Sequence, residues 1–112
     1  MTPTSLPAGA LALSELVTPT PGGIASRVIA KAAGGSLTVF AFDAGEGLSE
    51  HTSPHEAFVL PLEGVLRVTV GGVATEAAAG TIVRLPAGTP HAVETTVPAR
   101  MLLVMLRATE TR

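Results

Sequence analysis

The chain has 112 residues, a length that suits one domain with a single modest core. Its net charge of -2 and the absence of any run of Lys or Arg exclude a basic surface for nucleic-acid phosphates, so we expect no nucleic-acid partner. The chain has no Cys, so it forms no disulfide, and a metal ion would have to be held by His, carboxylate or water.

The distribution of apolar residues indicates a cytoplasmic protein without membrane contact. Residues 1–16 lack the positive start and the continuous apolar stretch of a secretory signal, and nowhere do about 18 apolar residues follow one another. Hydrophobic residues make up 46% of the chain and charged residues only 14%, which is more apolar surface than a small monomer buries. We therefore expect self-association.

Residues 1–23 are predicted to form an N-terminal arm, and residues 24–112 the folded domain. The arm contains four of the nine prolines and the pair Gly22-Gly23. So many residues that interrupt regular structure leave room only for a short turn at about residues 11–17.

From residue 24 onward the pattern changes to short stretches rich in Val, Leu, Ile, Thr and Phe, separated by glycine, which is typical of β-strands. The pairs Gly34-Gly35 and Gly71-Gly72 predict tight turns between strands. Strands at intervals of roughly 8 to 12 residues, without segments of helical period, predict an all-β sandwich or barrel. The expected strands are residues 24–32, 36–43, 56–62, 65–70, 73–77, 81–85, 91–96 and 100–107.

Two of these strands carry further information. Residues 101–106 are all apolar, so the last strand has two apolar faces; one face would pack in the core, and the other is expected to contact a second subunit in a homodimer. Pro61 lies within the strand expected at residues 56–62. Because proline cannot donate a hydrogen bond to a neighbouring strand, we expect an edge, a bulge or a bend there.

Two groups of residues at fixed spacing indicate where a functional site lies. The residues are, in chain order, Gly45, His51, Gly64, Gly80, Pro86, Gly88 and His91. Their spacing resembles the two motifs of the cupin superfamily, G-x5-H-x-H-x3-E-x6-G and G-x5-P-x-G-x2-H-x3-N. The resemblance implies a double-stranded β-helix, a jelly-roll barrel in which both motifs contribute to one site.

In the family that the chain resembles, three histidines and one glutamate bind a single divalent metal ion. His51 and His91 occupy two of the histidine positions in this chain. Ser53 stands at the other histidine position, Ala57 at the glutamate position and Thr95 at the asparagine position. Alanine has no donor atom and a serine hydroxyl is a poor ligand, so the metal site is incomplete.

His55 is the candidate for the missing ligand. If the segment is extended, residues 51, 53, 55 and 57 share one face, so His55 would point with His51 toward the cavity and Glu56 away from it. The resulting site of His51, His55 and His91 suits Zn, Fe, Ni or Cu, with open positions for a substrate. Pro54 bends the chain beside His55, however, and a bend can turn the ring toward solvent.

These residues support two main hypotheses. The first is a metal-dependent enzyme, dioxygenase-like by the family resemblance, that binds a small oxygenated ligand. The second is a metal-free, non-catalytic module that binds a small ligand in the barrel; a purely structural dimer ranks below both. No residue can be assigned as catalytic from the sequence. Phe42 is expected to belong to the core, and Met101 and Met105 to the core or to a subunit interface. The candidates for lining the pocket are Ser53, Ala57, Phe42, Met101 and Met105.

Overall fold

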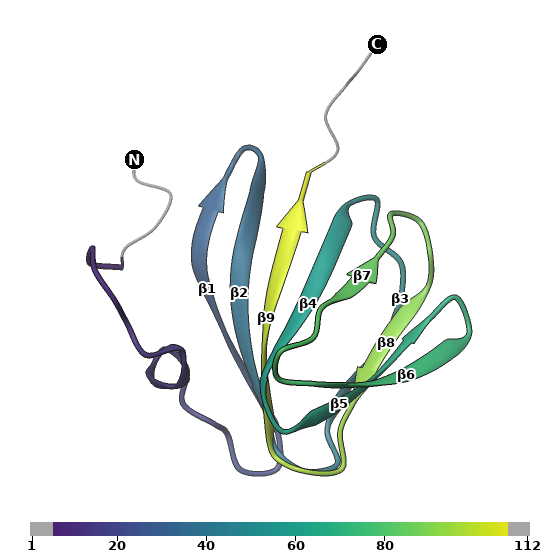
Figure 1. Ribbon diagram of the computed structural model, residues 1–112, viewed down its shortest axis with the longest axis horizontal. Coiled ribbons are helices and arrows are strands. Elements are labelled where there is room, and N and C mark those ends of the chain that lie inside the picture. The colour runs from purple at the N-terminus through teal and green to yellow at the C-terminus, as the bar shows by residue number, and fades with distance from the viewer. Residues whose placement is uncertain (1–5, 108–112) are drawn as a thin grey trace.

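The computed structural model describes residues 6–107, which form nine strands in two antiparallel sheets. The larger sheet has the order β1-β2-β9-β4-β7 and the smaller one the order β3-β8-β5-β6. The sheets come together at one end and spread toward the other (Figure 1). The strands are β1 (Ile24–Ala32), β2 (Gly35–Phe42), β3 (Gly47–His51), β4 (Glu56–Glu63), β5 (Val65–Val70), β6 (Val73–Ala78), β7 (Val83–Leu85), β8 (His91–Glu94) and β9 (Ala99–Leu106).

The all-β barrel expected from the sequence is confirmed, and all eight expected strands are present with ends that differ by at most two residues. The strand that the pattern did not predict is β3, a short segment at the edge of the smaller sheet. Its sequence, GLSEH, contains one large apolar residue and so gives no strand signal. The irregularity expected at Pro61 is a bulge, because the register between β4 and β9 shifts between Pro61 and Glu63.

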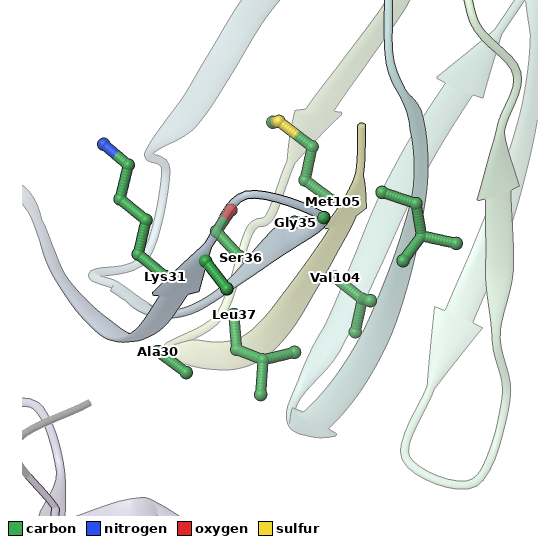
Figure 2. Close-up of a pocket in the computed structure, with 10 residues that line it drawn as sticks. Ala30, Lys31, Gly35, Ser36, Leu37, Val104 and Met105 are labelled. Carbon is green, nitrogen blue, oxygen red and sulfur yellow. The ribbon is translucent and has the colours of Figure 1, made fainter. Parts of the chain in front are cut away.

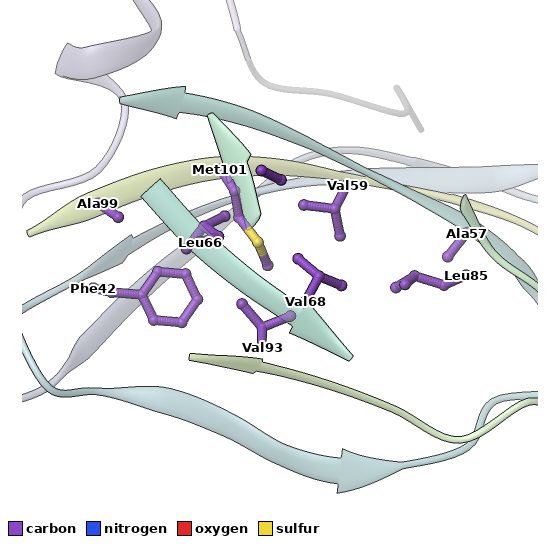
Figure 3. Close-up of a cluster of buried hydrophobic side chains, with 10 residues drawn as sticks. Phe42, Ala57, Val59, Leu66, Val68, Leu85, Val93, Ala99 and Met101 are labelled. Carbon is purple, nitrogen blue, oxygen red and sulfur yellow. The ribbon is translucent and has the colours of Figure 1, made fainter. Parts of the chain in front are cut away.

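The core lies between the two sheets and is built by alternation along the strands. In β4, Ala57 and Val59 are buried while their neighbours are partly exposed, and in β5 the same is true of Leu66 and Val68. Figure 3 shows side chains from both sheets directed toward one another in this cluster. The inner faces therefore supply most of the apolar burial that holds the sheets together.

The outer face of the larger sheet carries a second apolar cluster, to which the arm contributes. Val17 packs there with Ile29, Val39 and Ala41, and the Arg27 Nη1 atom donates a hydrogen bond to the Leu16 carbonyl at 3.2 Å. The short turn expected at about residues 11–17 is present as a 3-10 turn at Leu13–Glu15. The arm thus covers part of its own domain's sheet. Residues 1–5 of the predicted arm and residues 108–112 of the predicted domain lie outside the described residues.

Gly64, the last residue of the first motif, joins β4 to β5 where the backbone is crowded. Its φ is +76°, and a Cβ at this position would lie 2.5 Å from the Pro98 carbonyl oxygen. Any larger residue would therefore meet both a strained dihedral and a clash with main chain that cannot move aside easily. This part of the motif serves the fold rather than the site. No helix within residues 6–107 has the length and apolar character to span a membrane.

We expect Leu66→Ala to lower the free energy of unfolding by about 2–5 kcal/mol, because the Leu66 side chain is fully buried between the sheets. The matched control is Val73→Ala on the neighbouring strand β6, where the side chain is 66% exposed. The control should change stability by no more than about 0.5 kcal/mol. Chemical denaturation of both variants tests the placement of the core, and equal effects would contradict it.

Candidate functional site

The structure brings His51 and His91 together, as the motif spacing predicted. His51 is the last residue of β3 and His91 the first of β8, and they stand directly opposite each other in the antiparallel register. Their Nε2 atoms are 3.1 Å apart, and the ring centroids are 4.3 Å apart with the rings nearly perpendicular at 75°. Two segments 40 residues apart in the sequence therefore present two imidazole nitrogens to one point.

A bulge in β3 makes this arrangement possible. Leu48 lies opposite Val93, which is a core residue, and three residues later His51 lies opposite His91, only two residues before Val93. In a regular strand, side chains three residues apart point to opposite faces. The extra residue between Leu48 and His51 restores the inward direction, so both histidines face the interior side of the smaller sheet.

The Nδ1 atoms of both rings are held by backbone carbonyls. His51 Nδ1 lies 2.8 Å from the Ser49 oxygen and His91 Nδ1 lies 3.3 Å from the Thr89 oxygen. A carbonyl oxygen only accepts hydrogen bonds, so each Nδ1 carries the hydrogen, and in a neutral ring Nε2 then has a free lone pair. The two Nε2 atoms face each other across 3.1 Å, so a metal ion or a shared proton between them would join the two rings.

The two rings differ in exposure. His91 is buried, with 6% of its surface exposed, whereas His51 is exposed at the end of the edge strand. Burial lowers the pKa of His91 below its usual value of 6.5, the neighbouring His51 lowers it further, and the hydrogen bond to Thr89 acts in the opposite direction. The lowered pKa favours the neutral form of His91, in which the Nε2 lone pair can bind a cation.

The loop between β7 and β8 sets the direction of His91. Gly88 has a φ of +78° and donates its N–H to the Ser53 carbonyl at 2.8 Å, which ties this loop to the loop that follows β3. Thr89 N–H donates to the Pro86 carbonyl at 3.2 Å, and Gly71 N–H donates to the Pro90 carbonyl at 2.8 Å. The second motif is thus a tight turn fastened on both sides, from which β8 begins.

Glu56 also contacts this loop. Its Oε1 accepts a hydrogen bond from Arg84 Nε on β7, and its Oε2 accepts one from the Ala87 N–H at 3.2 Å. The hydrogen bond from Arg84 lowers the pKa of Glu56, and the one from Ala87 lowers it further. Strand alternation predicts that Glu56 faces away from the cavity, but no local pattern of the sequence reveals a hydrogen-bond partner 31 residues away.

The three-histidine site is not assembled. Within residues 6–107, no group of three or more His, Cys, Asp or Glu side chains is placed to hold a metal ion. The segment that carries His55 is not one extended strand: β3 ends at His51, β4 begins at Glu56, and the turn between them interrupts the alternation from which His55 was expected to join His51. His55 N–H donates to Ser53 Oγ at 3.1 Å, and its buried Nδ1 has no hydrogen-bond partner among the described residues.

Three of the five pocket candidates belong to the packed core. Phe42, Ala57 and Met101 are 1–3% exposed members of the cluster between the sheets. Met105 does line a groove, of about 270 Å³, at the tip of the β1–β2 hairpin and the end of β9 (Figure 2). A second hollow of about 480 Å³ lies over β5, β6 and the end of β8. Neither cavity is lined by His51, His91 or Ser53, and Ser53 is half-buried in the loop after β3.

The donor pair nevertheless fits a single metal ion. Two nitrogens bound to one zinc or similar ion at about 2.0–2.1 Å lie roughly 2.8 to 3.4 Å apart for coordination angles between a right angle and the tetrahedral angle. The separation of 3.1 Å between the Nε2 atoms falls in this range. Metal-bound histidines usually donate their other ring N–H to a carbonyl or carboxylate, as both rings do here.

The fold and the histidine pair define a small jelly-roll barrel whose site is built from two sequence motifs. The chain belongs to the cupin family, since the model described as Cupin domain matches residues 38–105. Within this barrel, His51 and His91 occupy two of the three histidine positions of the motifs, Ser53 occupies the third, and Ala57 stands at the glutamate position.

Solved structures agree with this assignment. A conserved protein of unknown function from Streptococcus pyogenes is 28% identical with a TM-score of 0.89, over 98% of this chain and 97% of that one. A cupin superfamily protein from Desulfitobacterium hafniense matches with 22% identity and a TM-score of 0.83, over 96% and 95% of the two chains, and supports the fold alone. A cupin 2 conserved barrel domain protein from Leptotrichia buccalis is 33% identical with a TM-score of 0.80, over 84% of this chain and 46% of that one. No curated protein matches the chain.

We expect nitrogen NMR of the metal-free protein to show a hydrogen on Nδ1 of both rings, because both Nδ1 atoms face carbonyl oxygens. Zn²⁺ should shift the Nε2 signals of both rings together. His55→Gln serves as the control for assignment and should leave these signals in place. A ring without a hydrogen on Nδ1 would contradict the arrangement.

Proposed function

We propose that this cupin binds one divalent metal ion through His51 and His91, and that the ion holds a small oxygenated ligand at the mouth of the barrel. The observation that supports this proposal is the pair of Nε2 atoms, 3.1 Å apart, with both Nδ1 atoms bonded to carbonyls. Zn, Fe, Ni and Cu are the ions that accept imidazole ligands most readily.

Two protein nitrogens leave at least two positions on the ion for water and ligand oxygens. A metal in this position would supply Lewis-acid or oxygen chemistry, and we propose a dioxygenase-like reaction on the family resemblance. The backbone carbonyls of Ser49 and Thr89 contact the Nδ1 atoms of the two rings and so orient the Nε2 atoms. Burial keeps His91 neutral and therefore able to donate its lone pair.

The second candidate function is a metal-free module that binds a small ligand. The observation in its favour is that residues 6–107 contain no group of three His, Cys, Asp or Glu side chains arranged for an ion. In this case the histidine pair would share a proton and offer a polar contact to the ligand. The two functions differ in their response to a chelator, which should abolish ligand binding in the first and leave it unchanged in the second.

We expect the purified protein to bind Co²⁺ or Zn²⁺ in a 1:1 ratio, and His51→Ala and His91→Ala to weaken binding by at least about tenfold, because each removes one of two nitrogen donors. Isothermal titration calorimetry and elemental analysis measure this. The matched control is His55→Ala, which removes a histidine outside the pair and should keep the affinity of the wild type. Protein that contains no metal and cannot be loaded would leave the metal-free module as the function.

We also propose that the chain forms a homodimer through the outer face of the larger sheet. Val104 on β9 lies between Leu37 on β2 and Phe58 on β4, and this row of apolar side chains is only half-buried. The arm residues Leu16 and Val17 pack against the cluster that contains Leu37 on the same face. A second copy would cover the row and account for the two apolar faces of β9.

We expect light scattering at micromolar concentration to give the mass of a dimer, and Val104→Lys to shift it toward the monomer, because a charge would be buried without a partner at the interface. Val73→Lys, at a 66% exposed position on the smaller sheet, is the matched control and should remain dimeric. A wild-type protein with the mass of a monomer would contradict the proposed interface.

A further inference from the structure

Glu56 occupies the first position of β4, and the alternation of that strand directs it to the outside. Its neighbour Ala57 is 3% exposed and packs in the core, so Glu56 and Phe58 project from the opposite face. On the adjacent strand β7, Arg84 lies opposite Phe58 on that same face. Glu56 is therefore outside the barrel and does not face the two imidazole rings.

Each oxygen of the Glu56 carboxylate has a different partner. Oε1 accepts from Arg84 Nε on strand β7, and Oε2 accepts from the main-chain N–H of Ala87, in the loop that follows this strand. The carboxylate thus joins the start of β4 to both the strand and the loop. Exposed ion pairs contribute little to stability, and the Arg84 side chain is 63% exposed. The ion pair with Arg84 therefore does not by itself explain why a carboxylate stands at position 56.

The contact with Ala87 lies close to the histidine pair along the chain. The next residue, Gly88, donates its N–H to Ser53, and Thr89 supplies the carbonyl that lies 3.3 Å from His91 Nδ1. Any shift of this loop would move the Thr89 carbonyl and the start of β8 together. A side chain on the outer surface is thereby linked, through three consecutive residues of main chain, to the orientation of the His91 ring.

We propose that Glu56 is a positioning residue for His91: by holding the Ala87 N–H it fixes the loop between β7 and β8, and so the direction in which His91 presents Nε2 to His51. The consequence for metal affinity rests on the proposed metal-binding function. The geometric claim about the ring does not depend on it.

The experiment measures Co²⁺ affinity and the ring-nitrogen NMR signals in three variants. Glu56→Ala removes both acceptor oxygens and should weaken Co²⁺ binding by about tenfold, the lower end of the effect of residues that orient metal ligands. Glu56→Gln keeps an amide oxygen for the Ala87 N–H and should restore most of the affinity. Glu76→Ala breaks the ion pair with Arg67, 3.8 Å long and remote from the loop, and should stay within about twofold of the wild type.

A merely structural role would lower the melting temperature without affecting the ring. In the metal-free protein, Glu56→Ala should broaden or shift the His91 Nδ1 and Nε2 signals, while Glu56→Gln and Glu76→Ala should leave them unchanged. Unchanged ring signals in folded Glu56→Ala would overturn the inference, as would equal loss of affinity in Glu56→Ala and Glu56→Gln. If the wild type binds no Co²⁺, the proposed metal function fails, and the ring signals alone decide the role of Glu56.

Discussion

The extra residue in β3 is the constraint on which the site depends. Side chains alternate along a strand, and Leu48, which packs against the core, lies an odd number of residues before His51. Without the bulge, either Leu48 or His51 would face the wrong side of the sheet. With it, the same short edge strand supports the core at one end and presents an imidazole opposite His91 at the other. The nitrogen pair is therefore a product of strand register rather than of a flexible loop.

Some positions of the two motifs are required by the backbone of the barrel, and others supply side-chain donors to the site. In this chain the backbone positions are kept, but half of the side-chain donors are replaced. Gly64 and Gly88 adopt positive φ, and Gly64 also meets main chain at close range, so these positions serve the barrel whatever the site binds. The side chains at the motif positions for metal ligands are replaced in part: Ala57 packs in the core, and Ser53 accepts hydrogen bonds within the loops. What orients the remaining rings is mostly main chain, through the carbonyls of Ser49 and Thr89. A barrel can keep such an arrangement even when half of the usual side-chain donors have been replaced.

The larger sheet explains why so small a chain is so apolar. Its inner face packs against the smaller sheet, and its outer face packs in part against the arm through Val17. The strand β9 lies between β2 and β4 and contributes to both faces, so it does not alternate between apolar and polar residues. One edge of this sheet is β1, where Val28 is 58% exposed. The half-buried row around Val104 is the surface that we propose contacts a second copy.

The sequence by itself predicted the eight apolar strands and an irregularity at Pro61, because alternation and proline act locally along the chain. The convergence of His51 with His91 was implied by the resemblance of the two motifs to those of the cupin superfamily. The sequence did not predict β3, whose polar residues form a strand only through pairing with β8, and it left open whether the bend at Pro54 directs His55 away from His51. Extrapolating alternation across Pro54 failed because the segment turns between β3 and β4. The contacts of Glu56 with Arg84 and Ala87, and the carbonyls that orient the rings, were decided only by the tertiary structure, since they depend on which distant segments the register places side by side.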